Sequence, residues 1–247
     1  MNDKSARRLH LAVAWTGPLC LLTFFAGWIV LSHNYPPPDP MFTAQELVDK
    51  YYAKYRGGIM LGMSLSACFG MFYLPWTCIV SAQMMQREKV PILALMQLSG
   101  GLLTAWILVM CPCIWVWCAE SAPYGNPETI RTLHFISWYI FNMTWMITAI
   151  QYIAIGVFSL IDKQKPLLFP PWLGYLAIGV SITFIPLTFL PYFKSGPFAI
   201  NGLWAFHLIV AGFGITTLST SHYVFKEIGR MRLKVSPGIG QSISQSL

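Results

Sequence analysis

The residues of this chain that could hold a metal or a cofactor are histidines and cysteines set in apolar stretches of sequence. His134 and His207 fall in two different stretches, and paired histidines on separate helices are ligands that a b-type haem can use. If both stretches cross a membrane as helices, the two side chains differ in depth by roughly 9 Å. That offset is poor for the axial ligands of one haem, so haem is an alternative and the cofactor stays unassigned.

A copper or other metal site is a second alternative. Soft sulfur ligands suit Cu(I), and one neighbouring segment offers His207 three candidate partners of that kind: Met110, Cys111 and Cys113. The plainer interpretation makes His207 a neutral imidazole that is hydrogen-bonded to Thr144 or Gln151. The Cys-Pro-Cys run is then a packing segment with unreactive thiols.

Motifs for catalysis are absent from the sequence. The chain has no Walker loop and no G-x-G-x-x-G, G-x-S-x-G or H-E-x-x-H motif, and no two of its histidines are three or four residues apart. If the protein is an enzyme, we expect His207 and Glu120 to act on the substrate. That substrate would be a lipid, a terpenoid or a hydrocarbon, converted with or without haem or copper.

The composition sets the class of protein. Of the 247 residues, 55% are hydrophobic and only 10% are charged, and the mean hydropathy is +0.56. Soluble domains carry about 25% charged residues, so a water-soluble globule is excluded. We expect an all-α polytopic membrane protein whose surroundings are the lipid bilayer, and we do not expect it to bind nucleic acid.

Six apolar segments are long enough to cross the hydrocarbon, since a crossing takes about 20 helical residues. They lie at about 9–32, 57–85, 92–118, 133–161, 171–191 and 198–224. They lack the alternation of barrel strands, so we expect one bundle of six transmembrane helices. Pro75 should kink the second segment, and Pro186 should bend the fifth near its outer end. The membrane domain is placed at 1–232, and 233–247 is expected to be a disordered cytoplasmic tail.

The basic residues predict the orientation. With six spans both termini lie on one side, and the segments on that side hold eleven of the sixteen Lys and Arg: Lys4, Arg7, Arg8, Arg87, Lys89, Lys163, Lys165, Lys226, Arg230, Arg232 and Lys234. By the positive-inside rule we expect both termini in the cytoplasm and the protein in a plasma or inner membrane.

The first outer loop, about 33–56, contains a helix-start pattern. In Thr43-Ala44-Gln45-Glu46 the threonine and the glutamate can cap each other's backbone N–H, which is a capping box. Leu47, Tyr51 and Tyr55 follow at four-residue spacing and share one face. We expect a short amphipathic helix on the outer leaflet with its tyrosines at headgroup depth, and a lid over an outer-facing pocket is the alternative. Gly57-Gly58 should separate this helix from the second span.

A ridge of small residues runs along the second segment at four-residue spacing: Gly58, Gly62, Ser66 and Gly70. Such a ridge lets two helix backbones approach closely in a membrane. Packing within the chain is the plainer interpretation, and contact with another membrane subunit is the alternative.

Polar side chains also share faces of the third and fourth segments, where lipid offers them no hydrogen-bond partner. They are Gln97, Thr104 and Cys111 in the third segment, and Ser137, Asn142, Thr144 and Gln151 in the fourth. We expect these faces to point into the bundle. They either join the helices by hydrogen bonds or line a polar pocket or path.

Three functional hypotheses follow. The core of every segment lacks Asp, Glu, Lys and Arg, which argues against an ion-coupled pump. The favoured hypothesis is a non-catalytic membrane protein, either a subunit or scaffold of a complex or a binder of a lipophilic small molecule. A channel or facilitator that uses the polar faces is the second hypothesis, and the membrane enzyme described above is the third.

Overall fold

The structure is a computed structural model that describes residues 3–230, and the regular structure in that range is helical. Six of its helical rods are long and apolar enough to cross a membrane: Lys4–Leu31, Ala44–Met85, Ile92–Ser121, Pro127–Ile161, Pro171–Tyr192 and Leu203–Arg230. The prediction of an all-helical bundle with six spans is confirmed. The tail predicted at 233–247 lies outside the described residues.

Each span is built from one or more helical elements. Span one is α1 (Asp3–Phe25) with the π-helical turn η1 (Ala26–Leu31). The second rod holds α2 (Ala44–Leu47), the π-helical η2 (Val48–Ala53), α3 (Lys54–Gly70) and α4 (Tyr73–Met85). Span three is α5 (Ile92–Ser121), and span four is α6 (Pro127–Met143) with α7 (Trp145–Ile161). Span five is α8 (Pro171–Thr183) with the 3₁₀ helix η3 (Ile185–Tyr192), and span six is the π-helical η4 (Leu203–Leu208) with α9 (Ile209–Arg230).

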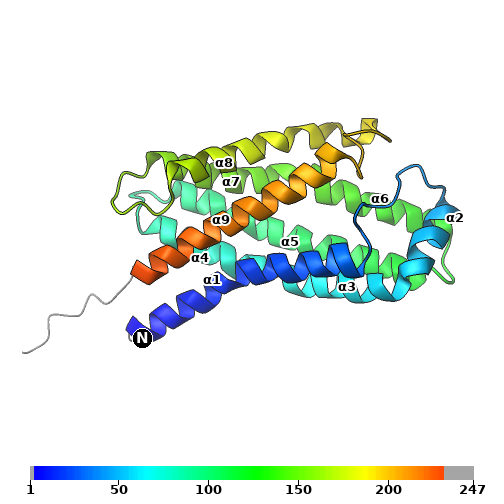
Figure 1. Cartoon of the computed structure of the whole chain (residues 1–247), viewed down its shortest axis with the longest axis horizontal. Helices are drawn as coiled ribbons and strands as arrows, with labels where there is room; N and C mark the ends of the chain where they lie inside the picture. Colours follow the sequence, from blue (N-terminus) through cyan, green and yellow to red (C-terminus); the bar gives the residue numbers. More distant parts are fainter. Residues whose placement is uncertain (1–2, 231–247) are drawn as a thin grey trace, which may run out of the picture.

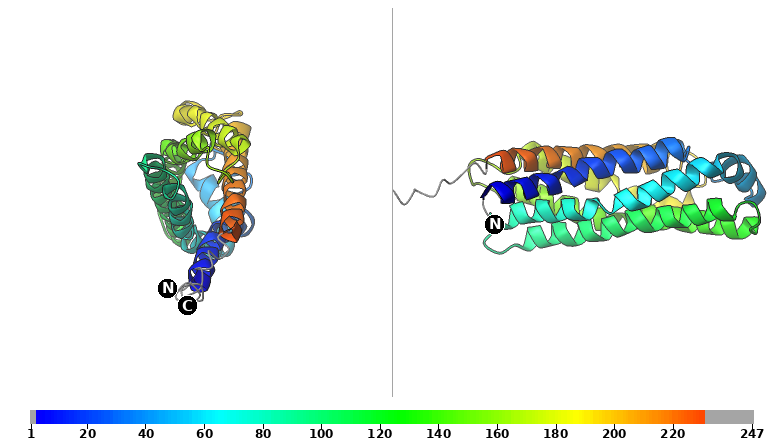
Figure 2. Two further views of the ribbon diagram at one scale, coloured as in Figure 1. Left: turned by 90° about the vertical axis from the view of Figure 1, so that its left-hand side faces the viewer. Right: turned by 90° about the horizontal axis from the view of Figure 1, so that it is seen from below.

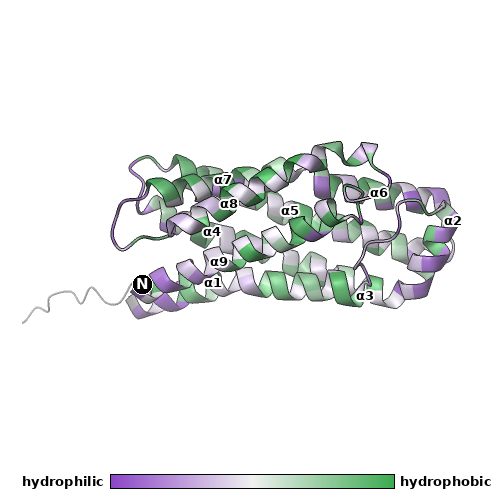
Figure 3. Cartoon of the chain, turned by 45° about the horizontal axis from the view of Figure 1, so that its top comes forward, coloured by the Kyte–Doolittle hydropathy of each residue, from purple (hydrophilic) through white to green (hydrophobic). Residues whose placement is uncertain are grey.

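The rods lie side by side along the length of the molecule (Figure 1), and the end-on view in Figure 2 shows them arranged around a common axis. The start of α1 and the end of α9 lie at one end, and α2 lies at the other (Figure 1). Hydrophobic residues dominate the middle of the rods and hydrophilic residues their ends (Figure 3), as expected for helices that cross a bilayer.

Prolines explain two of the interruptions in the rods. The second span breaks at Met71 and Phe72, one turn before Pro75, which has no N–H to donate to the carbonyl of Met71. In span five, where a bend was predicted near Pro186, α8 ends and the chain continues as the 3₁₀ helix η3. Pro112, by contrast, stays inside the continuous helix α5.

The helix predicted in the first loop begins at the predicted residue, and its apolar face packs against α6. The capping box of Thr43 and Glu46 is confirmed, because the Glu46 N–H donates to Thr43 Oγ1 and the Thr43 N–H donates to the Glu46 carboxylate. Tyr51 is buried against His134 of α6. The backbone also continues through Gly57-Gly58, and its departure from helical angles falls at Tyr55. Burial of the apolar face against α6 explains why this helix covers the end of the bundle.

The small-residue ridge lies against two neighbouring spans of the same chain. A Cβ at Gly62 would overlap the carbonyl oxygen of Gly27, and one at Gly58 would overlap that of Leu31. Ser66 Oγ donates to the carbonyl of Phe24 at 3.0 Å, and Gly70 faces α5. The ridge thus brings span two into backbone contact with span one and span three.

An ionic cluster joins three segments at the end of the bundle where the termini lie. Arg87, after α4, pairs with Asp162 at 3.2 Å and with Glu227 of α9 at 2.7 Å. The side chains of Arg87 and Asp162 are only 11% and 3% exposed. Arg87 also donates to the carbonyl of Pro166, so one guanidinium fixes α4, the α7–α8 connection and α9 together.

Candidate functional site

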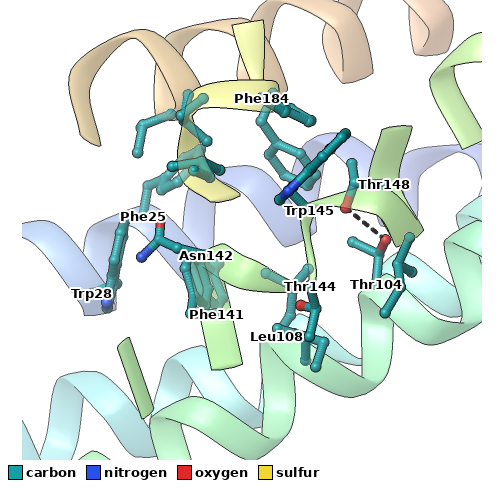
Figure 4. Close-up of a pocket in the computed structure, with 17 residues that line it drawn as sticks. Phe25, Trp28, Thr104, Leu108, Phe141, Asn142, Thr144, Trp145, Thr148 and Phe184 are labelled. Carbon is teal, nitrogen blue, oxygen red and sulfur yellow. Dashed lines mark hydrogen bonds between the residues drawn. The ribbon is translucent and has the colours of Figure 1, made fainter. Parts of the chain in front are cut away.

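An apolar cavity lies inside the bundle, about midway along the rods. Its volume is about 70 Å³, and residues of spans one, three, four, five and six line it (Figure 4). Most of these residues are half-buried, so the cavity reaches the side of the bundle. Among the residues that line it, none is Asp, Glu, Lys, Arg, His or Cys.

Interruptions of regular helix from four spans converge on this cavity. The π-helical turn η1 contributes Trp28, and the start of η3 contributes Leu187 next to Phe184. Ile209 follows directly after the π-helical η4, and Thr144 separates α6 from α7. Single π turns and 3₁₀ segments inside helices are found frequently at functional sites.

The break at Thr144 has a local cause other than proline. Thr144 has φ −82° and ψ 15°, and its Oγ1 donates to the carbonyl of Ile140 at 2.7 Å. A hydroxyl that bonds to the carbonyl four residues back competes with the helix and bends it. The break turns Asn142 and Trp145 toward the cavity from either side (Figure 4).

Aromatic rings close one end of the cavity. The Trp28 ring centroid lies 5.4 Å from that of Phe141 and 5.8 Å from that of Trp138, and Trp115 packs behind them. The indole N–H groups of these three tryptophans are buried and have no hydrogen-bond partner within residues 3–230. Three unpaired donors in one apolar cluster are unusual, since buried polar groups are almost always paired.

Polar groups of the cavity wall are few and come from α5, α6 and α7. Thr104 and Thr148 lie 2.9 Å apart across the space between α5 and α7 (Figure 4). Asn142 donates from Nδ2 to the carbonyl of Trp138 at 3.0 Å. This lining is suited to a molecule that is mostly hydrocarbon with one or two polar atoms.

The two histidines singled out in the sequence lie toward the end of the bundle opposite the termini, and they have different hydrogen-bond partners. His134 is buried and hydrogen-bonded to Tyr52, with 2.7 Å between Nδ1 and the phenol oxygen. His207 Nδ1 lies 3.0 Å from the hydroxyl of Tyr35 in the first outer loop. Span six begins at Leu203, five residues later than expected, so His207 is in its first turns and not near mid-membrane.

The sulfur ligands and the acid proposed with His207 are dispersed. Cys111 is buried and Cys113 is exposed, and neither lines the cavity. Across residues 3–230 no group of three or more His, Cys, Asp or Glu side chains is placed to hold a metal ion. Glu120 accepts a hydrogen bond from the hydroxyl of Tyr124, and this bond raises the pKa of Tyr124 above its ordinary value. Within residues 3–230 the side chain hydrogen-bonded to His207 is therefore Tyr35, and not Glu120, Cys111 or Cys113.

Most of the polar faces of spans three and four are held in hydrogen bonds. Gln97 Nε2 donates to Thr77 Oγ1 at 2.8 Å, and Gln151 accepts from the hydroxyl of Tyr73 at 2.9 Å. Ser137 Oγ donates to the carbonyl of Cys111 at 3.1 Å. The partners on span two, Tyr73 and Thr77, were missed in the sequence because they stand alone among apolar residues without a repeating pattern.

Comparison of the chain with protein-family models, with curated proteins and with solved structures finds no match. The function must therefore be argued from the cavity and the residues around it.

Proposed function

We propose that the protein binds a lipophilic small molecule within the membrane, in the cavity that spans one, three, four, five and six enclose. The cavity itself carries the proposal. Its volume of about 70 Å³ is below the range of roughly 300–1,000 Å³ that sites for whole drug-sized molecules occupy, so the cavity holds part of a lipid-like molecule whose remainder lies in the bilayer. Its wall is mainly aliphatic and aromatic, so it favours an uncharged, hydrocarbon-like occupant over an ion.

Binding is favoured over the alternatives by what the wall contains. A catalytic site needs a nucleophile, an acid or base, or a metal, and the lining offers none of these groups. Conduction needs a polar path, whereas the glutamines of spans three and four are held in hydrogen bonds with span two. The ridge of small residues gives no support for a partner subunit, because its backbone contacts lie within this chain.

The occupant is proposed to enter sideways from the bilayer. Trp145 lines the cavity and is half-buried, and its indole N–H donates to Thr188 Oγ1 of η3 at 3.1 Å. Thr188 is exposed on the outside of the bundle. This hydrogen bond joins spans four and five at the side of the cavity, so we place the entrance there.

Saturable photolabelling in nanodiscs tests the proposal. The probe is a long-chain alkane that carries a diazirine, and an excess of the unlabelled alkane serves as competitor. We expect competitor-sensitive labelling of the peptide that contains Val210, and we expect Val210→Phe to abolish it by filling the cavity. Ile215→Phe, on the exposed face of the same helix, is the matched control and should label like the unmodified chain. Labelling that competitor leaves unchanged at every position would contradict the proposal, because lipid-facing surfaces do not saturate.

The basic segments also support a proposed orientation, with both termini in the cytoplasm and the protein in a plasma or inner membrane. Both ends of the described chain lie on one side of the bundle (Figure 1), on the side that holds Arg87, Lys89 and Lys163. That arrangement suits the positive-inside rule.

A further inference from the structure

The hydrogen-bond donors on the wall of the cavity are largely engaged. Thr104 Oγ1 donates its single hydrogen to the carbonyl of Gly100 at 2.9 Å, so Thr148 is the donor in the Thr104–Thr148 bond. Thr144 donates to Ile140, and Trp145 donates to Thr188. The threonine hydroxyls can therefore offer an occupant only lone pairs.

Asn142 presents an unpaired acceptor to the same cavity. The residue is only 4% exposed and lines the cavity. Its Nδ2 donates to the carbonyl of Trp138, which fixes the amide with Oδ1 as the free atom, and Oδ1 accepts no hydrogen bond from residues 3–230. Since the residue lines the cavity, Oδ1 can accept a hydrogen bond from a molecule bound there.

Trp28, which also lines the cavity (Figure 4), adds a second unpaired group. Its indole N–H is buried and has no partner in the described part of the chain. A hydroxyl is the small neutral group that donates one hydrogen bond and also accepts one. A ketone or an ester only accepts, and a carboxylate, phosphate or ammonium would need a counter-charge that the wall lacks.

We infer that the ligand is an uncharged lipophilic alcohol whose hydroxyl donates a hydrogen bond to Asn142 Oδ1 while its hydrocarbon part follows the aromatic wall of the cavity and extends into the bilayer. The inference rests on the proposed function, because it names the class of molecule that the same cavity takes. Asn142 is thereby the residue that selects the alcohol.

Competition against the photolabel described above tests the inference. Three competitors of matched shape are compared at equal mole fraction in the bilayer: geranylgeraniol, its methyl ether and the corresponding hydrocarbon. We expect the alcohol to displace the label at about three- to tenfold lower mole fraction than the other two, the effect of one net hydrogen bond. Asn142→Leu, which keeps the size of the side chain, should remove this difference while the hydrocarbon still competes. Thr183→Val removes a comparable hydroxyl outside the cavity and is the matched control.

The outcomes separate the inference from the proposed function. If the unmodified chain shows no saturable label at all, the proposed function fails. If the label saturates but the alcohol, ether and hydrocarbon compete equally, the inference is overturned and an acyl chain or other hydrocarbon is the occupant. An alcohol preference that survives in a correctly folded Asn142→Leu protein would also overturn the inference. If Asn142→Leu does not fold, the comparison of alcohol, ether and hydrocarbon in the unmodified chain still tests the inference.

Discussion

The hydroxyl of Tyr52 and Nδ1 of His134 lie 2.7 Å apart, and both side chains are buried where the outer helix crosses α6. Tyr51 packs edge-on against Tyr52 at 5.0 Å between ring centroids, and Tyr51 donates to the carbonyl of Ser32 at 3.0 Å. The segment that leads into span two is therefore fastened to span one and span four. The four-residue spacing in the sequence predicted a helix on the membrane surface. In the structure the tyrosines of this helix pack against α6, across the end of the bundle opposite the termini.

Tyr52→Phe should lower stability. The change leaves Nδ1 of His134 buried without its partner, which costs about 1–3 kcal/mol. Thermal unfolding in detergent, followed by circular dichroism, measures the effect. Tyr55→Phe is the matched control, because the half-buried ring of Tyr55 stacks on His33. Equal melting temperatures for the two variants would show that the Tyr52–His134 bond does not hold the cover in place.

Gly62→Ala should weaken the contact between spans one and two. The added Cβ overlaps the carbonyl oxygen of Gly27, and relief of that overlap costs about 1–3 kcal/mol. Gly57→Ala is the control in the same helix, because a Cβ at Gly57 meets nothing within 4 Å. The stabilities of the two variants are compared by unfolding each one in detergent mixtures of increasing denaturing strength. A Gly62→Ala protein as stable as Gly57→Ala would mean that the two backbones do not approach so closely.

Arg87→Met should be the most destabilising of these changes. It leaves the carboxylate of Asp162, 3% exposed, without its cation, and removal of one partner of a buried pair costs about 3–5 kcal/mol. The yield of monodisperse protein and its melting temperature both report the loss. Lys89→Met, at an exposed position in the same loop, removes an equal charge and should leave both unchanged. If the two variants behave alike, the ionic cluster is not needed for assembly.

Thr188→Val should speed the exchange of ligand with the bilayer. It removes the acceptor for the Trp145 indole N–H without changing the size of the side chain, and loss of one net hydrogen bond raises the rates by about three- to tenfold. The rate at which photolabelling reaches its plateau measures this, with Thr183→Val as the control. Unchanged rates would place the entrance elsewhere.

The orientation can be tested by labelling cysteines in intact cells. Glu128→Cys lies at an exposed position in the first turn of α6, at the end opposite the termini, and Lys163→Cys lies in the α7–α8 connection at the end that holds the termini. A membrane-impermeant maleimide should label the first and not the second. The unmodified chain is the control, because its own exposed cysteines, Cys68, Cys78 and Cys113, lie within the spans. The reverse pattern would invert the proposed topology.

The six spans could be predicted from the sequence, because each helix that crosses a bilayer needs about 20 mainly apolar residues. The start of span six was placed too early for a definable reason. Phe198, Ala199 and Ile200 are apolar, but Gly196 has φ +83° and the chain turns there, with the Ala199 N–H donating to the carbonyl of Gly196. A hydropathy pattern cannot distinguish such an apolar turn from the first turn of a helix.

The cavity could not be predicted, because the features that form it leave no pattern in the sequence. The break at Thr144 has no proline, and the π-helical turns at Trp28 and before Ile209 occur in ordinary apolar runs. Asn142 and Thr144 were recognised as polar residues of the interior, but their hydrocarbon neighbours come from five separate spans. Only the packed structure brings those neighbours together.

The break at Thr144 also gives span four a pivot. Since α6 and α7 are separate helices that meet at Thr144, a change of angle there moves α6 while α7 stays anchored beside the Arg87 cluster. Helix α6 carries Asn142 near this junction and, two turns farther away, His134, which is bonded to the covering helix. One rigid helix therefore links the wall of the cavity to the end of the bundle opposite the termini, so that a shift at either place is mechanically coupled to the other.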